Sequence, residues 1–61
     1  MRLSEFKEAI NKEIQERPDL KEEILDLYEL AMDEIDGGCS AMHEMELCMN
    51  SIEELKNGTN Q

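Results

Sequence analysis

Two interruptions in an otherwise helical pattern, at Pro18 and at Gly37-Gly38, do most to limit what this chain can fold into. The residue before a proline avoids the α region, while proline itself suits the first turn of a helix. Glycine readily adopts the left-handed conformation that often follows a helix. Because the chain has 61 residues, these breaks divide it into three segments, each with room for one helix.

The first segment carries a narrow apolar stripe at helical spacing. Its members are Phe6, Ala9, Ile10 and Ile14. Ser4 is a good N-cap residue and would leave Glu5 in the first turn, where a negative charge suits the helix dipole. We therefore expect a helix over about 5–16 that Pro18 ends, and that depends on the rest of the chain for its stability.

The second segment predicts a longer helix, over about 19–36, with a broad apolar arc. One face carries Leu20, Ile24, Leu27, Tyr28, Ala31 and Ile35. Two starts are open: Pro18 occupies the first helical position, or Asp19 caps the helix with Glu22 reaching back. Leu25 and Met32 widen the apolar arc on one side, whereas Leu30 stands apart from it.

The third segment predicts a helix over about 40–56 that Ser40 caps. Its apolar stripe consists of Ala41, Met45, Cys48, Ile52 and Leu55. Met42 and Met49 flank this stripe on the same angular side as Leu25 and Met32 flank the second helix. Leu47 stands apart from the stripe, so Leu30 and Leu47 are either isolated exposed leucines or interface anchors.

These segments predict an all-α fold in which a short joint forces the two longer helices into an antiparallel hairpin. The short N-terminal helix completes a three-helix mini-bundle, with a single domain over 1–57 and a disordered tail over 58–61. Both long helices have apolar arcs wider than their mutual contact covers. A second copy of the chain is therefore an expected partner, with Leu25, Met32, Met42 and Met49 as candidate apolar interface residues.

The charge is strongly acidic and unevenly distributed. Sixteen acids stand against six bases, for a net charge of −10, and Glu22 to Leu55 contain eleven acids with no Lys or Arg. Direct contact with nucleic acid or an anionic membrane is disfavoured, because phosphates need cationic partners. A protein partner with a basic surface is favoured, although acidity that only confers solubility explains the same pattern. The candidate partner-binding acids are Asp26, Glu29, Asp33, Asp36, Glu46 and Glu53.

Two cysteines and the only histidine lie close together in the sequence and suggest a metal site. Cys48 belongs to the apolar stripe, while His43 falls on the opposite face of the helix, so the two cannot hold one ion within one chain. Cys39 and His43 supply only two ligands, and structural zinc needs four. We expect no metal and no cofactor; a site shared across a dimer, or a metal or thiol sensor at Cys39 and His43, stays open.

The thiols themselves have separate expected roles. Nine helical residues place Cys39 and Cys48 about 13 Å apart, too far for a disulfide. Cys48 is a small core residue, whereas Cys39 lies near a helix N-terminus, which would lower its pKa. The start of the chain has no apolar signal region, and no apolar run in the sequence is long enough to span a membrane. Two cysteines in such a sequence predict a protein of the reducing cytoplasm with free thiols.

Two functions are compatible with this sequence. The first is a small acidic protein-binding module, an antagonist or regulator that docks on a basic partner surface; its acid rows would imitate nucleic acid, by analogy with antagonists of phages and mobile elements. The second is a homo-oligomeric helical building block or assembly subunit without a dedicated ligand. Catalysis is not expected, because a helical hairpin of this size offers little concavity for a substrate and its carboxylates should be solvated.

Overall fold

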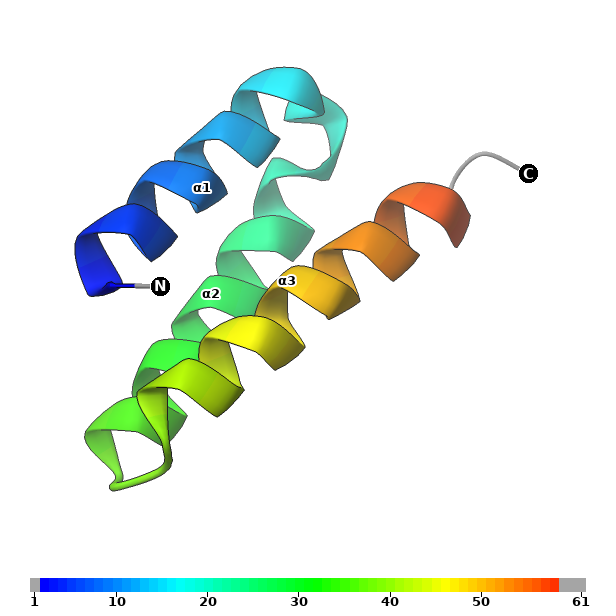
Figure 1. The fold of residues 1–61 in the computed structure, drawn as a ribbon. Helices are drawn as coiled ribbons and strands as arrows, with labels where there is room; N and C mark the ends of the chain where they lie inside the picture. Colours follow the sequence, from blue (N-terminus) through cyan, green and yellow to red (C-terminus); the bar gives the residue numbers. More distant parts are fainter. Residues whose placement is uncertain (1, 59–61) are drawn as a thin grey trace.

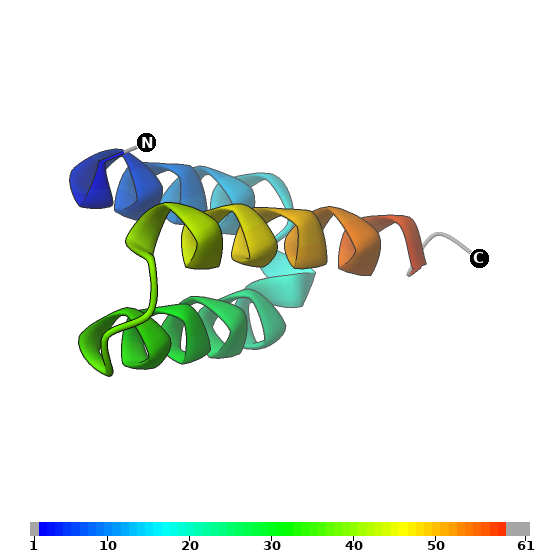
Figure 2. The ribbon, with the colours of Figure 1, turned by 60° about the horizontal axis from the view of Figure 1, so that its bottom comes forward.

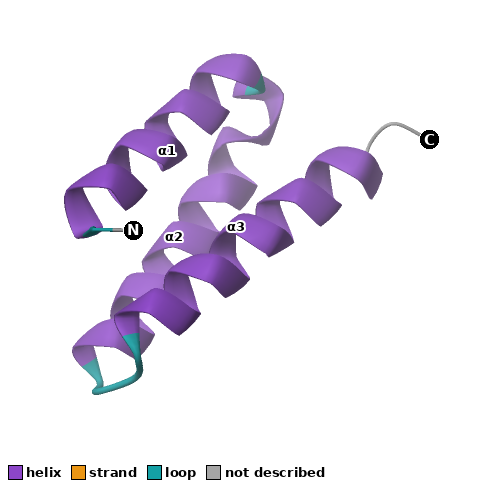
Figure 3. Cartoon of the chain, in the orientation of Figure 1, coloured by secondary structure: helices purple, strands orange, loops and turns teal. Residues whose placement is uncertain are grey.

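The computed structural model describes residues 2–58. Over that range the chain forms α1 (Leu3–Glu16), a 3-10 turn η1 (Pro18–Leu20), α2 (Lys21–Asp36) and α3 (Ala41–Gly58), with no strand (Figure 3). The all-α three-helix mini-bundle is therefore confirmed. Pro18 and the two glycines separate the helices at the positions that the sequence indicates.

The start of α1 differs from the expected one. Ser4 lies inside the helix, which begins at Leu3 with Arg2 at the N-cap position. The Glu5 carboxylate accepts a hydrogen bond of 2.9 Å from the Arg2 backbone N–H. Glu5 thus satisfies a backbone group that the helix leaves without a partner, as the glutamate of a capping box does. The helix therefore starts two residues earlier than it would with Ser4 as its N-cap.

The joint between α1 and α2 is built around Pro18, which opens the 3-10 turn. Pro18 occupies the first position of this turn, whereas α2 itself begins at Lys21 with Leu20 at its N-cap position, two residues later than the expected start at about residue 19. Asp19 makes no capping hydrogen bond to α2 and instead pairs with Arg17 at 3.0 Å. The hydrogen bond from Arg17 lowers the pKa of the Asp19 carboxyl. Because the Asp19 side chain pairs with Arg17 and not with the start of α2, the capping alternative is wrong.

The joint between α2 and α3 follows the expected hairpin. Gly38 has a φ of +105°, which residues with a side chain rarely adopt, and the Cys39 backbone N–H returns to the Glu34 carbonyl at 3.0 Å. Ser40 Oγ accepts a hydrogen bond of 3.4 Å from the His43 backbone N–H, so Ser40 caps α3 as predicted. The two helices then run antiparallel and side by side (Figures 1 and 2).

The C-terminal end of α3 also differs from the expectation. The helix continues through Asn57 and ends at Gly58, so Gly58 belongs to α3 and not to the predicted tail. Residues 59–61, the rest of that tail, lie outside the described residues.

The core lies where the three predicted apolar stripes meet. Its buried members are Phe6, Ile10, Leu20, Ile24, Ala31, Met45, Cys48 and Ile52. Each belongs to a stripe identified from helical spacing alone. The other stripe residues of α2 and α3 (Leu27, Tyr28, Ile35, Ala41 and Leu55) are half-buried and pack around this core.

α1 packs against one side of the α2–α3 hairpin. The Phe6 ring meets Tyr28 of α2 with ring centroids 5.3 Å apart, and Glu13 pairs with Lys56 of α3 at 2.6 Å. The hydrogen bond to Glu13 raises the pKa of the Lys56 ammonium. Figure 2 shows α1 across one side of the pair. Because a single helix covers one side, the other side of the hairpin has no cover among the described residues.

Candidate functional site

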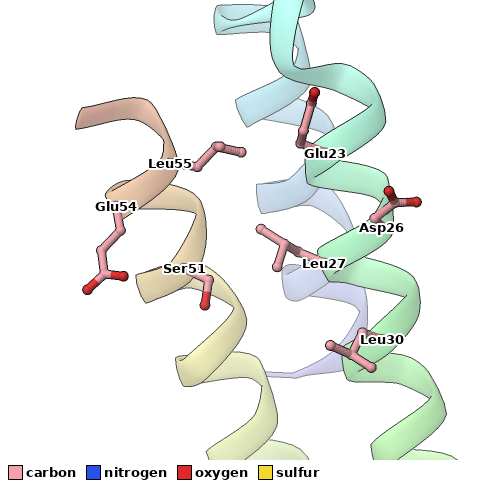
Figure 4. A pocket seen from close by; sticks show the side chains of 7 residues that line it. All are labelled: Glu23, Asp26, Leu27, Leu30, Ser51, Glu54 and Leu55. Carbon is pink, nitrogen blue, oxygen red and sulfur yellow. The ribbon is translucent and has the colours of Figure 1, made fainter. Parts of the chain in front are cut away.

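A groove runs between α2 and α3. Two adjoining hollows share Leu27, Leu30 and Ser51, so they form one continuous depression. Figure 4 shows Leu27, Ser51 and Leu55 turned toward the space between the helices, with α1 behind them. The larger hollow has a volume of about 520 Å³. That is within the roughly 300–1,000 Å³ of small-molecule sites, but this groove is open to solvent, which suits side chains of a docked protein.

The floor and walls of the groove are apolar. Ala31 and Cys48 are buried at its base, and Leu27 is half-buried above them. Leu30 and Leu47 are 58% and 47% exposed and line the same hollow from the two helices. The structure therefore brings together the two leucines that stood apart from the helical stripes. They are not isolated exposed residues.

The rim of the groove is acidic. Glu23 and Asp26 of α2 and Glu44 and Glu54 of α3 line it, and the lining residues include no Lys or Arg. Figure 4 shows the carboxylates of Asp26 and Glu54 turned away from the gap, one on each helix. An apolar groove with negative charge on both sides favours a bound molecule that has an apolar stripe with cationic groups along its edges.

The predicted acidic residues lie at several different places on α2 and α3. Of that set, Asp26 lines the groove; Glu46 lines a hollow with Met42 and Met49, and Glu53 lines a third hollow beside Lys56. The other three acids of the set (Glu29, Asp33 and Asp36) are exposed on α2. Sequence spacing identified the rows of acids but missed Glu23, Glu44 and Glu54, because only the pairing of α2 with α3 shows which acids border the gap. Partner contact by the predicted set stays a prediction.

The predicted apolar interface residues lie apart from the groove. On α2, Tyr28 contacts Phe6 of α1, and Met32 lies one turn further along the same flank. On α3, Lys56 pairs with Glu13 of α1, and Met49 lies two turns before it on the same flank. Met32 and Met49 are accordingly half-buried and pack on the core. The other two members of the set, Leu25 and Met42, are 39% and 68% exposed. Their role as interface residues stays a prediction.

The stretch with both cysteines and His43 forms the hairpin joint and the start of α3. Cys48 is a buried core residue, as predicted, and burial raises the pKa of its thiol. Cys39 is exposed, and its thiol donates to a Glu34 carboxylate oxygen at 3.4 Å. This hydrogen bond is the main cause that raises the pKa of Cys39. The expected lowering is therefore wrong, because the hydrogen bond to a neighbouring carboxylate favours the protonated thiol.

Cys39 should accordingly react slowly with thiol reagents. A raised pKa leaves less thiolate at a given pH, and thiolate is the form that reacts. We expect Glu34→Ala to move the pH profile of Cys39 alkylation by iodoacetamide to lower pH and to raise the rate near pH 7.5. Asp36→Ala removes another charge near the end of α2 and serves as the control. Equal rates in both variants and the parent would contradict the assigned role of Glu34.

Within the described part of the chain, no group of three or more His, Cys, Asp or Glu residues is arranged to hold a metal ion. Over residues 2–58, none of the helices combines the length and the apolar character needed to cross a bilayer. Comparison with protein-family models, with curated proteins and with solved structures finds no match to this chain.

Proposed function

We propose that this chain is a small acidic protein-binding module, an antagonist or regulator that docks on the basic surface of a partner protein. The observation that carries the proposal is the continuous apolar groove bordered by four acids, within a stretch of eleven acids that has no Lys or Arg. Negative charge of this density attracts a basic surface over distance and speeds encounter. The apolar groove then supplies the short-range contact that charge alone does not.

The proposal has a sharper form, in which the acids of α2 and α3 occupy positions on the partner that nucleic acid would otherwise take. Small acidic antagonists of phages and mobile elements are the analogy for this form. Such a module would act in the cytoplasm and without catalysis. It would make no direct contact with nucleic acid or membrane, because its negative charge repels phosphate.

The alternative is a homo-oligomeric structural subunit. The exposed leucines of the groove favour it, since apolar surface promotes association. The rim opposes it in one arrangement: two copies that met groove to groove would bring eight carboxylates together, twice the four that line each groove. Like charges at a contact are unfavourable, so we place this function second. Sedimentation at micromolar concentration separates the two, because the binding module is expected to stay monomeric without its partner.

Affinity purification with the tagged chain from its native host tests the proposal. We expect the retained protein to carry a basic surface and to dissociate as salt rises, because salt screens the attraction between exposed charges. Salt-independent retention, or retention of acidic or neutral proteins alone, would count against it. Thermal melts of the free chain at each salt concentration are the control. Salt screens the self-repulsion of a −10 chain, so the free chain should melt no lower as salt rises, and loss of binding then reports the complex.

A further inference from the structure

We infer that the α2–α3 groove is the docking site for an amphipathic helix of the partner protein. The partner's apolar residues enter the groove, and Lys or Arg residues that flank them pair with the acidic rim. This inference rests on the proposed function and adds the surface of this chain and the structural element of the partner. The acids elsewhere on the molecule then serve encounter more than specific contact.

The shape of the groove indicates a helix as the occupant. Its α3 wall extends from Glu44 to Leu55, a length of about 17 Å at 1.5 Å per residue. That length matches about three turns of a second helix. Both walls are helices whose backbone groups are bonded internally, so no free strand edge is offered to an extended peptide. A helix laid into the space between two antiparallel helices completes a bundle, with side chains of the newcomer between those of the walls.

The apolar anchors lie where a docked helix would need them. Leu30 and Leu47 are exposed on opposite walls of one hollow, above the buried side chains of Ala31 and Cys48. Small side chains at the base leave depth for a large side chain from the partner. Such a side chain would bury the exposed faces of both leucines at once, which is the arrangement that concentrates binding energy in a few residues.

The charges of the groove select its occupant. A second copy of this chain has no Lys or Arg between Glu22 and Leu55, so the bases of its α2 and α3 are confined to Lys21 and Lys56. Lys56 already pairs with Glu13 of its own chain. These helices therefore offer few cations to the four rim acids. A nucleic acid brings phosphates, which these acids repel. A helix with an apolar stripe and basic edges satisfies both the floor and the rim.

The test uses two synthetic peptides of one composition. One, about 14 residues long, places leucines at i, i+3, i+4 and i+7 with lysines on both edges; the other has the same residues shuffled so that no stripe remains. Binding is measured by fluorescence anisotropy, and the contact surface by amide shifts of the ¹⁵N-labelled chain. We expect the striped peptide to bind at least about tenfold tighter and to shift amides around Leu30 and Leu47.

Matched variants locate the contact. The double variant Leu30→Ala/Leu47→Ala should weaken binding of the striped peptide by about tenfold or more. Leu3→Ala, at an exposed leucine of α1 that does not line the groove, should leave it unchanged. On the rim, Glu54→Gln should weaken binding about two- to fivefold, while Glu53→Gln beside it should have less effect. Far-UV circular dichroism of each variant verifies that the fold is kept.

The outcomes separate this inference from the proposed function. If both peptides bind equally, with salt sensitivity but without response to the groove variants, the groove inference is wrong and basic-surface recognition stands. If neither peptide nor any host protein binds in a salt-dependent manner, the proposed function fails as well. Amide shifts around Leu30 and Leu47 that depend on protein concentration alone, with a dimer in sedimentation, would make a second copy the occupant and overturn the inference.

Discussion

Truncation of Phe6 to alanine should abolish the cooperative unfolding transition of this protein. Phe6 of α1 is fully buried and packs against Tyr28 of α2. Removal of a buried aromatic side chain costs about 3–5 kcal/mol. A single core in a chain below roughly 70–80 residues rarely supplies more than about 3–5 kcal/mol in total. The expected loss therefore equals the available free energy of unfolding.

Urea and thermal denaturation followed by far-UV circular dichroism measure this effect. Phe6→Leu retains most of the apolar volume and should show a weakened but cooperative transition. It should also reduce the near-ultraviolet signal of Tyr28, which loses its ring partner. Leu3→Ala, on the same helix but at a residue 47% exposed, should cost less than about 1.5 kcal/mol. A Phe6→Ala variant that unfolds like the parent would show that α1 contributes little to the core.

Truncation of Ile52 to alanine is expected to have the second largest effect, a loss of about 2–5 kcal/mol in the free energy of unfolding. Ile52 is 1% exposed and belongs to the core cluster that joins α3 to the other helices. The side chain is lost from the middle of the core cluster, and the surrounding structure relaxes only partly into such a cavity. Ile52→Val, which removes one methylene, should cost about 0.5–1.5 kcal/mol.

Leu47→Ala is the matched control for this prediction, since it shortens an aliphatic side chain of the same helix at an exposed groove residue. Its midpoint of urea denaturation should stay close to that of the parent. Similar losses for Ile52→Ala and Leu47→Ala would mean that the groove leucines belong to the core, and would remove the reason for treating them as anchors for a partner.

Local chemistry accounts for the parts of the fold that could be predicted. Gly38 adopts the left-handed region because few other residues do so at low cost, and Pro18 opens a helical turn because its φ is already fixed there. The failure at Ser4 is also local: two residues compete to cap one helix start, and Glu5 reaches the Arg2 amide. Sequence spacing cannot rank such neighbours, since a capping side chain contributes only about 0.5–2 kcal/mol.

The candidate site depended on information of another kind. The apolar arcs of α2 and α3 are wide on both flanks, and spacing within a helix does not say which flank a third helix covers. Two predicted interface residues, Met32 and Met49, lie on the flank of the hairpin that α1 covers. The groove between Leu30 and Leu47 lies on the opposite flank, which α1 does not cover. One aromatic contact at Phe6 and one ion pair at Glu13 mark the side that α1 takes.

The sequence by itself determined three helices, their joints, the residues of the core and an acidic surface, because each follows from periodicity, turn chemistry or charge within a short stretch. Only the tertiary structure decided which side of the hairpin α1 covers and which acids border the opening that remains. That decision arises from contacts between residues far apart in the chain, such as Glu13 with Lys56, and no local pattern encodes them.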